Sequence, residues 1–200
     1  VYKETAEKTG TLAGADIQPT RALSIGIPFN DGPDFDAHQE FNGQFDDVAI
    51  WDRVLTTQEI TDLFSKAVVA GDLTTSQALC YDFDIGLPLD SSGNDRHGSL
   101  LGDTQAIFND PLVEDAAADN DGTATGGVAM AEGAATGPIT VTAWVKTDTY
   151  GAEQFIIDES YTSVYGGGLS MSFTDTGKLR FWNQDSAYAV ESDTTVKENE

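Results

Sequence analysis

The sequence predicts an all-β protein: an antiparallel β-sandwich or jelly roll of two sheets with one short helix. Apolar residues make up 40% and aromatic residues 10% of the 200 residues, which is enough for a hydrophobic core. Short segments rich in β-branched and aromatic residues recur along the chain, and several alternate apolar with polar side chains. Turn-forming clusters of Gly, Asn, Asp and Ser separate these segments at the spacing of a sandwich.

The strand pattern is strongest in six segments. In residues 139–145, Ile139 and Val141 share one face and Trp144 lies on the other, which is the period of a half-buried strand. Residues 174–177, Thr-Asp-Thr-Gly, predict a hairpin turn. Residues 119–122, Asp-Asn-Asp-Gly, lack the spacing of an EF-hand loop, so we expect a flexible turn there. The predicted strands are residues 22–27, 45–51, 139–145, 155–157, 169–173 and 178–182.

One helix is expected directly after the second strand. Thr56 and Glu59 have the spacing of a capping box, in which each side chain accepts a hydrogen bond from the backbone N–H of the other residue. Ile60, Leu63 and Phe64 then follow at positions i, i+3 and i+4 and form a one-sided apolar face. The residues after this helix, 68–76, are expected to be a connector.

Residues 41–60, FNGQFDDVAIWDRVLTTQEI, resemble the closing strand and helix of LamG-like (concanavalin A-like) jelly rolls. Residues 79–98 are similar to the opening strand of the same family and to its D-x-S-G-N loop. Residues 137–146 and 168–182 resemble its central strand and the hairpin that follows. The resemblance implies a concanavalin A-like sandwich whose closing phrase precedes its opening strand in this chain.

This order defines the expected organisation. Residues 1–67 correspond to the C-terminal half of a LamG-like jelly roll, 68–76 to a connector and 77–200 to the N-terminal part of another. The chain is then either part of a tandem array or a circular permutant whose two parts fold together. Half a sandwich would leave apolar side chains such as Phe45, Val141 and Phe173 in water. We therefore expect the two segments to share one sandwich, within one molecule or by exchange of half-domains between molecules.

The charge excludes one class of partner. Asp and Glu outnumber Lys and Arg by 34 to 10, so the net charge is −24, and a surface this negative repels nucleic acid.

No apolar run has the roughly 20 residues that a membrane span needs. Cys80 is the single cysteine, so no disulfide is formed within the chain, and we expect a small buried side chain. An excess of acid is typical of proteins in salt- or calcium-rich surroundings, so we expect an extracellular or cell-surface location.

Two aspartates are the candidate metal ligands. The resemblance implies that Asp46, the first Asp of the D-D-V-x-I phrase, binds a structural Ca²⁺. Asp84, next to Phe83 on the opening strand, would lie near Asp46 if the two strands are neighbours, as they are in the family. A carboxylate buried in a strand must be paired or bind a cation. In the alternative interpretation, Asp46 accepts a hydrogen bond from a backbone N–H and no metal is bound.

Catalytic patterns are missing, and aromatic residues suggest binding instead. The laminarinase-type enzymes that share this fold carry E-x-D-x-x-E or E-x-D-x-E on one strand, and no such run occurs here. We therefore predict no enzymatic activity. Aromatic side chains that stack on sugar rings and polar neighbours that bind hydroxyls make Trp182, Asn183 and Tyr165 candidate ligand-binding residues. Trp144 stays open, because its strand pattern points outward whereas the resemblance implies a buried Trp.

The favoured function is a noncatalytic extracellular module for adhesion or assembly, stabilised by calcium. A carbohydrate-binding module of a secreted enzyme or adhesin is the first alternative. A subunit of an extracellular fibre, self-associating by half-domain exchange, is the second. The expected partner is a glycan or another protein subunit.

Overall fold

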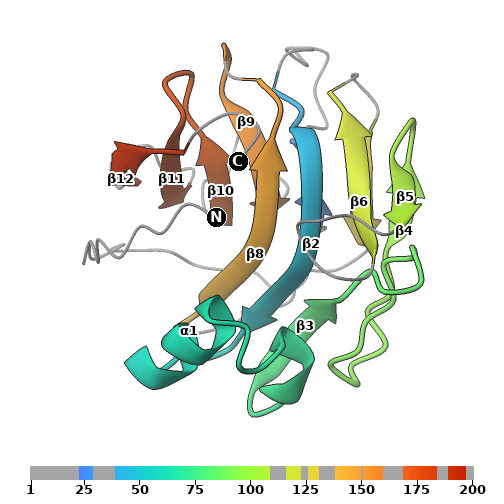
Figure 1. Ribbon diagram of the computed structural model, residues 1–200, viewed down its shortest axis with the longest axis vertical. Coiled ribbons are helices and arrows are strands. Elements are labelled where there is room, and N and C mark those ends of the chain that lie inside the picture. The colour runs from blue at the N-terminus through green and yellow to red at the C-terminus, as the bar shows by residue number, and fades with distance from the viewer. Residues whose placement is uncertain are drawn as a thin grey trace.

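Two antiparallel sheets pack face to face as a sandwich with one α-helix, which confirms the predicted fold class (Figure 1). Each pair of named strands is antiparallel. The computed structural model describes residues 23–28, 39–108, 116–122, 126–130, 138–149, 151–159, 169–183 and 189–196.

The larger sheet has seven strands. The hairpin predicted from residues 174–177 joins its β10 and β11, in which Phe173 pairs with Leu179. In spatial order the strands are β12 (Ala189–Thr195), β11 (Lys178–Asn183), β10 (Leu169–Phe173), β9 (Gln154–Glu159), β1 (Leu23–Ile25), β7 (Gly127–Met130) and β4 (Ser99–Leu101).

The smaller sheet is built around one long strand, β2 (Asn42–Trp51). On one side β2 pairs along most of its length with β8 (Thr140–Thr147). On the other side residues 42–45 pair with β6 (Ala116–Asp121) and residues 48–51 with β3 (Gln77–Tyr81). The strand β5 (Gln105–Phe108) extends the sheet beyond β6.

Both sheets combine strands from the two ends of the chain. The early strand β1 lies between β9 and β7, and β2 lies between β8 and the pair formed by β3 and β6. The expectation of one shared sandwich is thus confirmed, and the strands pair within a single chain. The assignment of residues 1–67 and 77–200 to the back and front halves of two jelly rolls remains a prediction.

The core between the sheets contains the residues that the alternation pattern placed inside. Phe45, Val48 and Ile50 of β2 are fully buried there, and Val141 and Val145 of β8 pack against them. The pairing of Asp46 with Trp144 puts both side chains on the opposite, outer face of β2 and β8. Trp144, whose face the sequence left open, thus lies on the outer face, as its alternation indicates, and is half-buried there.

The predicted helix is confirmed as α1 (Thr57–Phe64), with Thr56 as its N-cap and a complete capping box to Glu59. It contains no buried residue, and Ile60 is 50% exposed. The apolar face of α1 is therefore only partly covered by the sheet beneath it. The connector that follows contains a short 3₁₀ helix, η1 (Ala70–Asp72).

The prediction of a flexible turn at residues 119–122 was wrong. Residues 119–121 continue β6, and Asn120 is 1% exposed in the core. Its side-chain amide donates hydrogen bonds to the carbonyl oxygens of Gly26 (3.1 Å) and Gly126 (3.0 Å). These carbonyl groups come from distant and neighbouring loops, so a turn-forming sequence is held in a strand by tertiary hydrogen bonds.

Candidate functional site

The candidate site lies where β2 changes its neighbour from β6 to β3. Its pairing with β8 shifts register between Asp46 and Ala49, and Asp47 has a left-handed φ of 47°. An irregularity of this kind re-aims side chains locally. After it, Val48 points into the core again, while Asp46 faces outward beside Trp144.

The carboxyl group of Asp46 is deeply buried. The residue is 2% exposed, and its one hydrogen bond to a described residue comes from Asp47 N to Oδ1 (2.7 Å). Burial raises the pKa of Asp46 from 3.8 to about 8. The hydrogen bond from Asp47 opposes this shift, and the charges of Asp47, Asp84 and Asp82 add to it. The site therefore disfavours a bare carboxylate unless a cation accompanies it.

Four aspartates line one cavity. Asp46 and Asp47 come from β2, while Asp82 and Asp84 follow the end of β3. The cavity has a volume of about 690 Å³ and extends over both faces of β8. The structure thus brings Asp84 close to Asp46, as expected from the pairing of their strands, and adds Asp47 and Asp82, which the sequence did not single out. The register shift in β2 lies at the first pair of aspartates, and Phe83, with a left-handed φ of 53°, lies between the second pair.

The outer part of the cavity has aromatic and apolar walls. The rings of Phe64, at the end of α1, and Trp144 have centroids 6.2 Å apart. The ammonium group of Lys66 lies 5.2 Å from the centroid of the Trp144 ring, within the range of a cation–π contact. The remaining outer wall is formed by Ile60, Leu63, Val68 and Val69.

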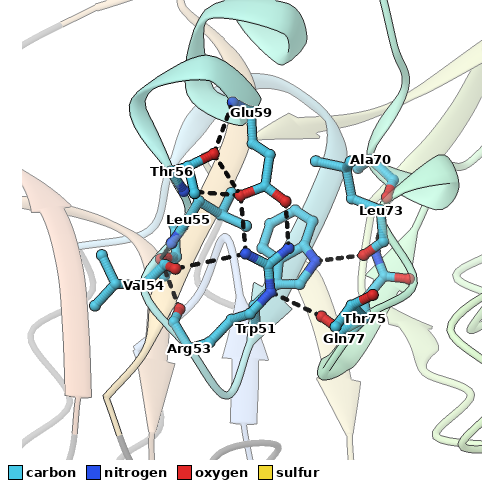
Figure 2. A network of polar contacts seen from close by, with 11 residues as sticks. Trp51, Arg53, Val54, Leu55, Thr56, Glu59, Ala70, Leu73, Thr75 and Gln77 are labelled. Carbon is cyan, nitrogen blue, oxygen red and sulfur yellow. Dashed lines mark hydrogen bonds and ion pairs between the residues drawn. The ribbon is translucent and has the colours of Figure 1, made fainter.

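An ion pair fixes α1 over this face, as Figure 2 shows. Both terminal nitrogens of Arg53 contact Glu59, at 2.9 and 2.7 Å, and Arg53 Nε donates to the carbonyl oxygen of Thr75. This pairing with Arg53, together with the capping bonds from Thr56, lowers the pKa of Glu59 to about 2. One guanidinium group therefore joins the end of β2, the first turn of α1 and the connector.

Two further hydrogen bonds hold the connector against the sheet (Figure 2). The indole N–H of Trp51 donates to the carbonyl oxygen of Leu73 (2.7 Å). The side-chain amide of Gln77 donates to the carbonyl oxygen of Ala70 (2.8 Å). Trp51, Leu55 and Ala70 form a small second core beneath them with Cys80, which is 0% exposed. Burial raises the pKa of Cys80 to about 12, so its thiol is a packing group, as the sequence predicted.

The charges around Asp46 suit a calcium ion, but the described side chains do not form a complete set of ligands for one. A desolvated carboxyl group surrounded by three other aspartates requires a positive partner, and carboxylate oxygens suit Ca²⁺. Among the described residues, however, no group of three or more His, Cys, Asp or Glu side chains is placed to share one metal ion. An ion held by Asp46 and Asp84 would take its remaining ligands from backbone carbonyl groups and water.

The other candidate residues do not join this site. Trp182 and Asn183 lie in β11 of the larger sheet, where they pair with Ser170 and Leu169. Tyr165 lies outside the described residues. The imidazole Nδ1 of His97 accepts a hydrogen bond from Asp90 N (3.0 Å).

The D-x-S-G-N loop is a structural device that covers one edge of the smaller sheet. The Asp90 carboxylate accepts hydrogen bonds from the backbone N–H groups of Cys80, Ser92 and Arg96. The side chains of Asn94 and Arg96 donate to carbonyl groups at the start of β3. The spacing of these residues in the sequence indicates a loop, but it does not indicate that the loop covers the edge of β3.

Within the described residues no helix is long and apolar enough to cross a membrane, and α1 has eight residues.

Comparison with known proteins gives one match. The profile described as the pentaxin family matches residues 7–87, which is less than half of the chain. No curated protein and no solved structure matches it. Pentaxins are noncatalytic, lectin-like proteins with a concanavalin A-like jelly roll; they are generally secreted and commonly bind calcium. The matched region contains β1, β2, α1 and β3, and the similarity agrees with the predicted fold and with the prediction that the chain is not an enzyme.

Proposed function

We propose that this chain is a noncatalytic, extracellular binding module of the lectin type, stabilised by Ca²⁺ bound at Asp46 and Asp84. The observation that carries the calcium proposal is the Asp46 carboxyl group: it is 2% exposed, accepts one hydrogen bond from the described residues and has three aspartates nearby. A divalent cation is the partner that offsets such a concentration of negative charge. The pentaxin match supports the secreted, lectin-like part of the proposal.

The strands of both sheets pair within one chain. Because β1 and β2 complete both sheets internally, the module needs no exchanged half-domain to bury its core. We propose that it is a self-contained unit that binds a glycan or another protein subunit. The alternative of a carbohydrate-binding module rests on Trp182, Asn183 and Tyr165, and loss of glycan binding in Trp182→Ala would support it.

Thermal unfolding with and without calcium tests the proposal. A ligand that binds only the folded state stabilises it, by about 2.7 kcal/mol when its concentration is 100 times its dissociation constant. We expect calcium to raise the melting temperature of the wild type but not of Asp46→Asn, whose side-chain oxygen still accepts the hydrogen bond from Asp47. The matched control is Asp175→Asn, which removes one charge from the exposed turn between β10 and β11.

Two results would contradict the calcium site. One is a wild-type melting temperature that is the same in calcium and in chelator. The other is an equal calcium response in Asp46→Asn and the wild type, which would place the ion elsewhere.

A further inference from the structure

The outer cavity is more than an acidic cluster. Asp46 is 2% exposed and lines the cavity, and the one hydrogen bond that its carboxyl group accepts from a described residue is the one from Asp47 N to Oδ1. A nearly buried carboxylate with a single hydrogen bond is costly, so a donor or a cation is expected beside it. This observation is independent of the number of aspartates.

The walls of the cavity favour an organic cation. Ile60, Leu63 and Val69 are aliphatic, and Trp144 and Phe64 present aromatic rings. A small hydrated ion gains nothing from such walls, whereas an alkyl stem that carries a charge buries apolar area against them. The ammonium group of Lys66 lies over the Trp144 ring, so this wall accommodates a cationic side chain, and a bound guanidinium group would take the place of Lys66 there.

Charge complementarity identifies the kind of partner. The chain has a net charge of −24, and Asp46, Asp47, Asp82 and Asp84 line this one cavity. A second copy of the same chain would bring equal negative charge, so a basic partner is favoured in the encounter. Arginine matches the site best, because its planar guanidinium group both stacks on aromatic rings and pairs with carboxylates.

We propose that the cavity between α1 and the outer face of β8 binds an arginine side chain of a basic, extended segment in a partner protein. The aliphatic stem packs against Ile60 and Leu63, the guanidinium group stacks near Trp144, and its N–H groups donate to Asp46. The proposal goes beyond the calcium site and competes with it, since both cations use the Asp46 carboxylate.

A labelled peptide of alternating arginine and glycine is the probe. Its binding to the full chain is measured by fluorescence anisotropy at physiological ionic strength, where exposed charges are largely screened. The control peptide carries citrulline, which keeps the shape of arginine without its charge. We expect the arginine peptide to bind and the citrulline peptide to bind at least about tenfold more weakly.

Variants locate the binding. We expect Asp46→Asn and Trp144→Leu each to weaken binding of the arginine peptide about tenfold, which corresponds to about 1.4 kcal/mol. Asp175→Asn removes the same charge far from the cavity and should leave the affinity within about twofold. Asp46→Asn keeps the acceptor for Asp47 N, so it remains a test if Trp144→Leu fails to fold.

The outcomes separate the two proposals. Equal binding of both peptides, or equal affinity of Asp46→Asn, Asp175→Asn and the wild type, overturns the arginine site. Binding that is lost in Asp46→Asn and is displaced by millimolar calcium supports both sites. Binding that is lost in Asp46→Asn but is unaffected by calcium supports the arginine site and contradicts calcium at Asp46.

Discussion

Asp46 shows how one residue couples the fold to pH. With the pKa of its carboxyl group raised from 3.8 to about 8, the folded chain holds a proton at neutral pH that the unfolded chain releases. A group that binds a proton more tightly in the folded state contributes stability at low pH and loses it as pH rises. The pH window is the interval between the unfolded and the folded pKa.

We predict that, in the presence of chelator, the melting temperature of the wild type falls as the pH rises from about 4 to about 8. In Asp46→Asn, which cannot titrate, the fall over this interval should be clearly smaller. Circular dichroism melts at a series of pH values provide the measurement. The same pH profile in both proteins would show that Asp46 does not carry the effect.

Glu40 is a second carboxyl group that is buried in unfavourable surroundings. It is 3% exposed, it forms an isolated bridge with Phe155, and neither of its carboxyl oxygens has a hydrogen-bond partner in the part of the chain that the structure describes. Burying a polar group without a partner costs about 1–3 kcal/mol on the evidence of protein mutations.

Replacing Glu40 by the apolar Met, which has a similar volume, should therefore raise the free energy of unfolding by about 1–3 kcal/mol. Urea denaturation measures this change. A decrease in stability would indicate that the carboxyl group has a favourable interaction in solution.

Among the elements, α1 depends on its ends rather than on burial. It has eight residues and no buried side chain, and an isolated helix of this length is unstable in water. Its N-terminus is held by Thr56 and by the contact of Glu59 with Arg53. These residues belong to the W-D-R-x-L-T-x-x-E phrase, so the phrase encodes the docking of the helix that walls the candidate site.

Thr56→Ala removes the N-cap and should destabilise the protein by about 0.5–2 kcal/mol. We expect a matching rise in hydrogen exchange of the α1 amides, because the capping bonds fix the first turn. Thr57→Ala removes a hydroxyl group from the next position without removing a cap and is the control. If Thr56→Ala and Thr57→Ala have equal stability, the capping box does not hold the helix.

The two sides of the smaller sheet differ in what lies against them: a loop on the side of β3 and the candidate cavity on the side of β8. The loop at residues 90–98 covers β3 with side-chain hydrogen bonds from Asn94, Arg96 and Ser91. On the opposite side β8 pairs with β2, and the candidate cavity runs along both of its faces. The side on which Asp46 and Trp144 lie therefore carries the candidate cavity, with α1 as its outer wall.

At the scale of the whole molecule, the order of the segments along the chain matters less than their pairing. The strands β1 and β2 come first in sequence among the described strands, yet each lies between two later strands. The segment between α1 and β3, residues 65–76, contains no strand, so its backbone is not part of either sheet, and Ala67 within it is exposed.

We predict that a protease site inserted between Ala67 and Val68 can be cut without separating the two fragments. The apolar faces of β1 and β2 remain buried against the later strands, and these contacts outweigh the loss of one covalent link. Size-exclusion chromatography of the cut protein should give one peak in buffer and two in concentrated urea. Separation of the fragments in buffer would contradict the shared core.

The candidate site was predicted from the sequence only in part. The D-D-V-x-I phrase drew attention to Asp46, and the pairing of two strands to Asp84. Asp47 belongs to the same phrase but was not singled out, and Asp82 and Lys66 carry no pattern of their own. All three lie near a register shift and three left-handed residues, Asp47, Lys66 and Phe83, which the sequence does not reveal. The turn expected at residues 119–122 failed for a related reason: the hydrogen bonds that hold Asn120 come from Gly26 and Gly126, and local propensity does not include them.

The amino-acid sequence by itself determined the strands with clear alternation, the capped helix, the charge of the molecule and the need for the two segments to bury each other's apolar faces. These features depend on period, capping and composition, which are local properties. Only the tertiary structure decided that the segments pair within one chain, that Trp144 faces outward against α1, and that four aspartates line one cavity. Such features depend on contacts between residues far apart in sequence, and their energies appear only when the chain has folded.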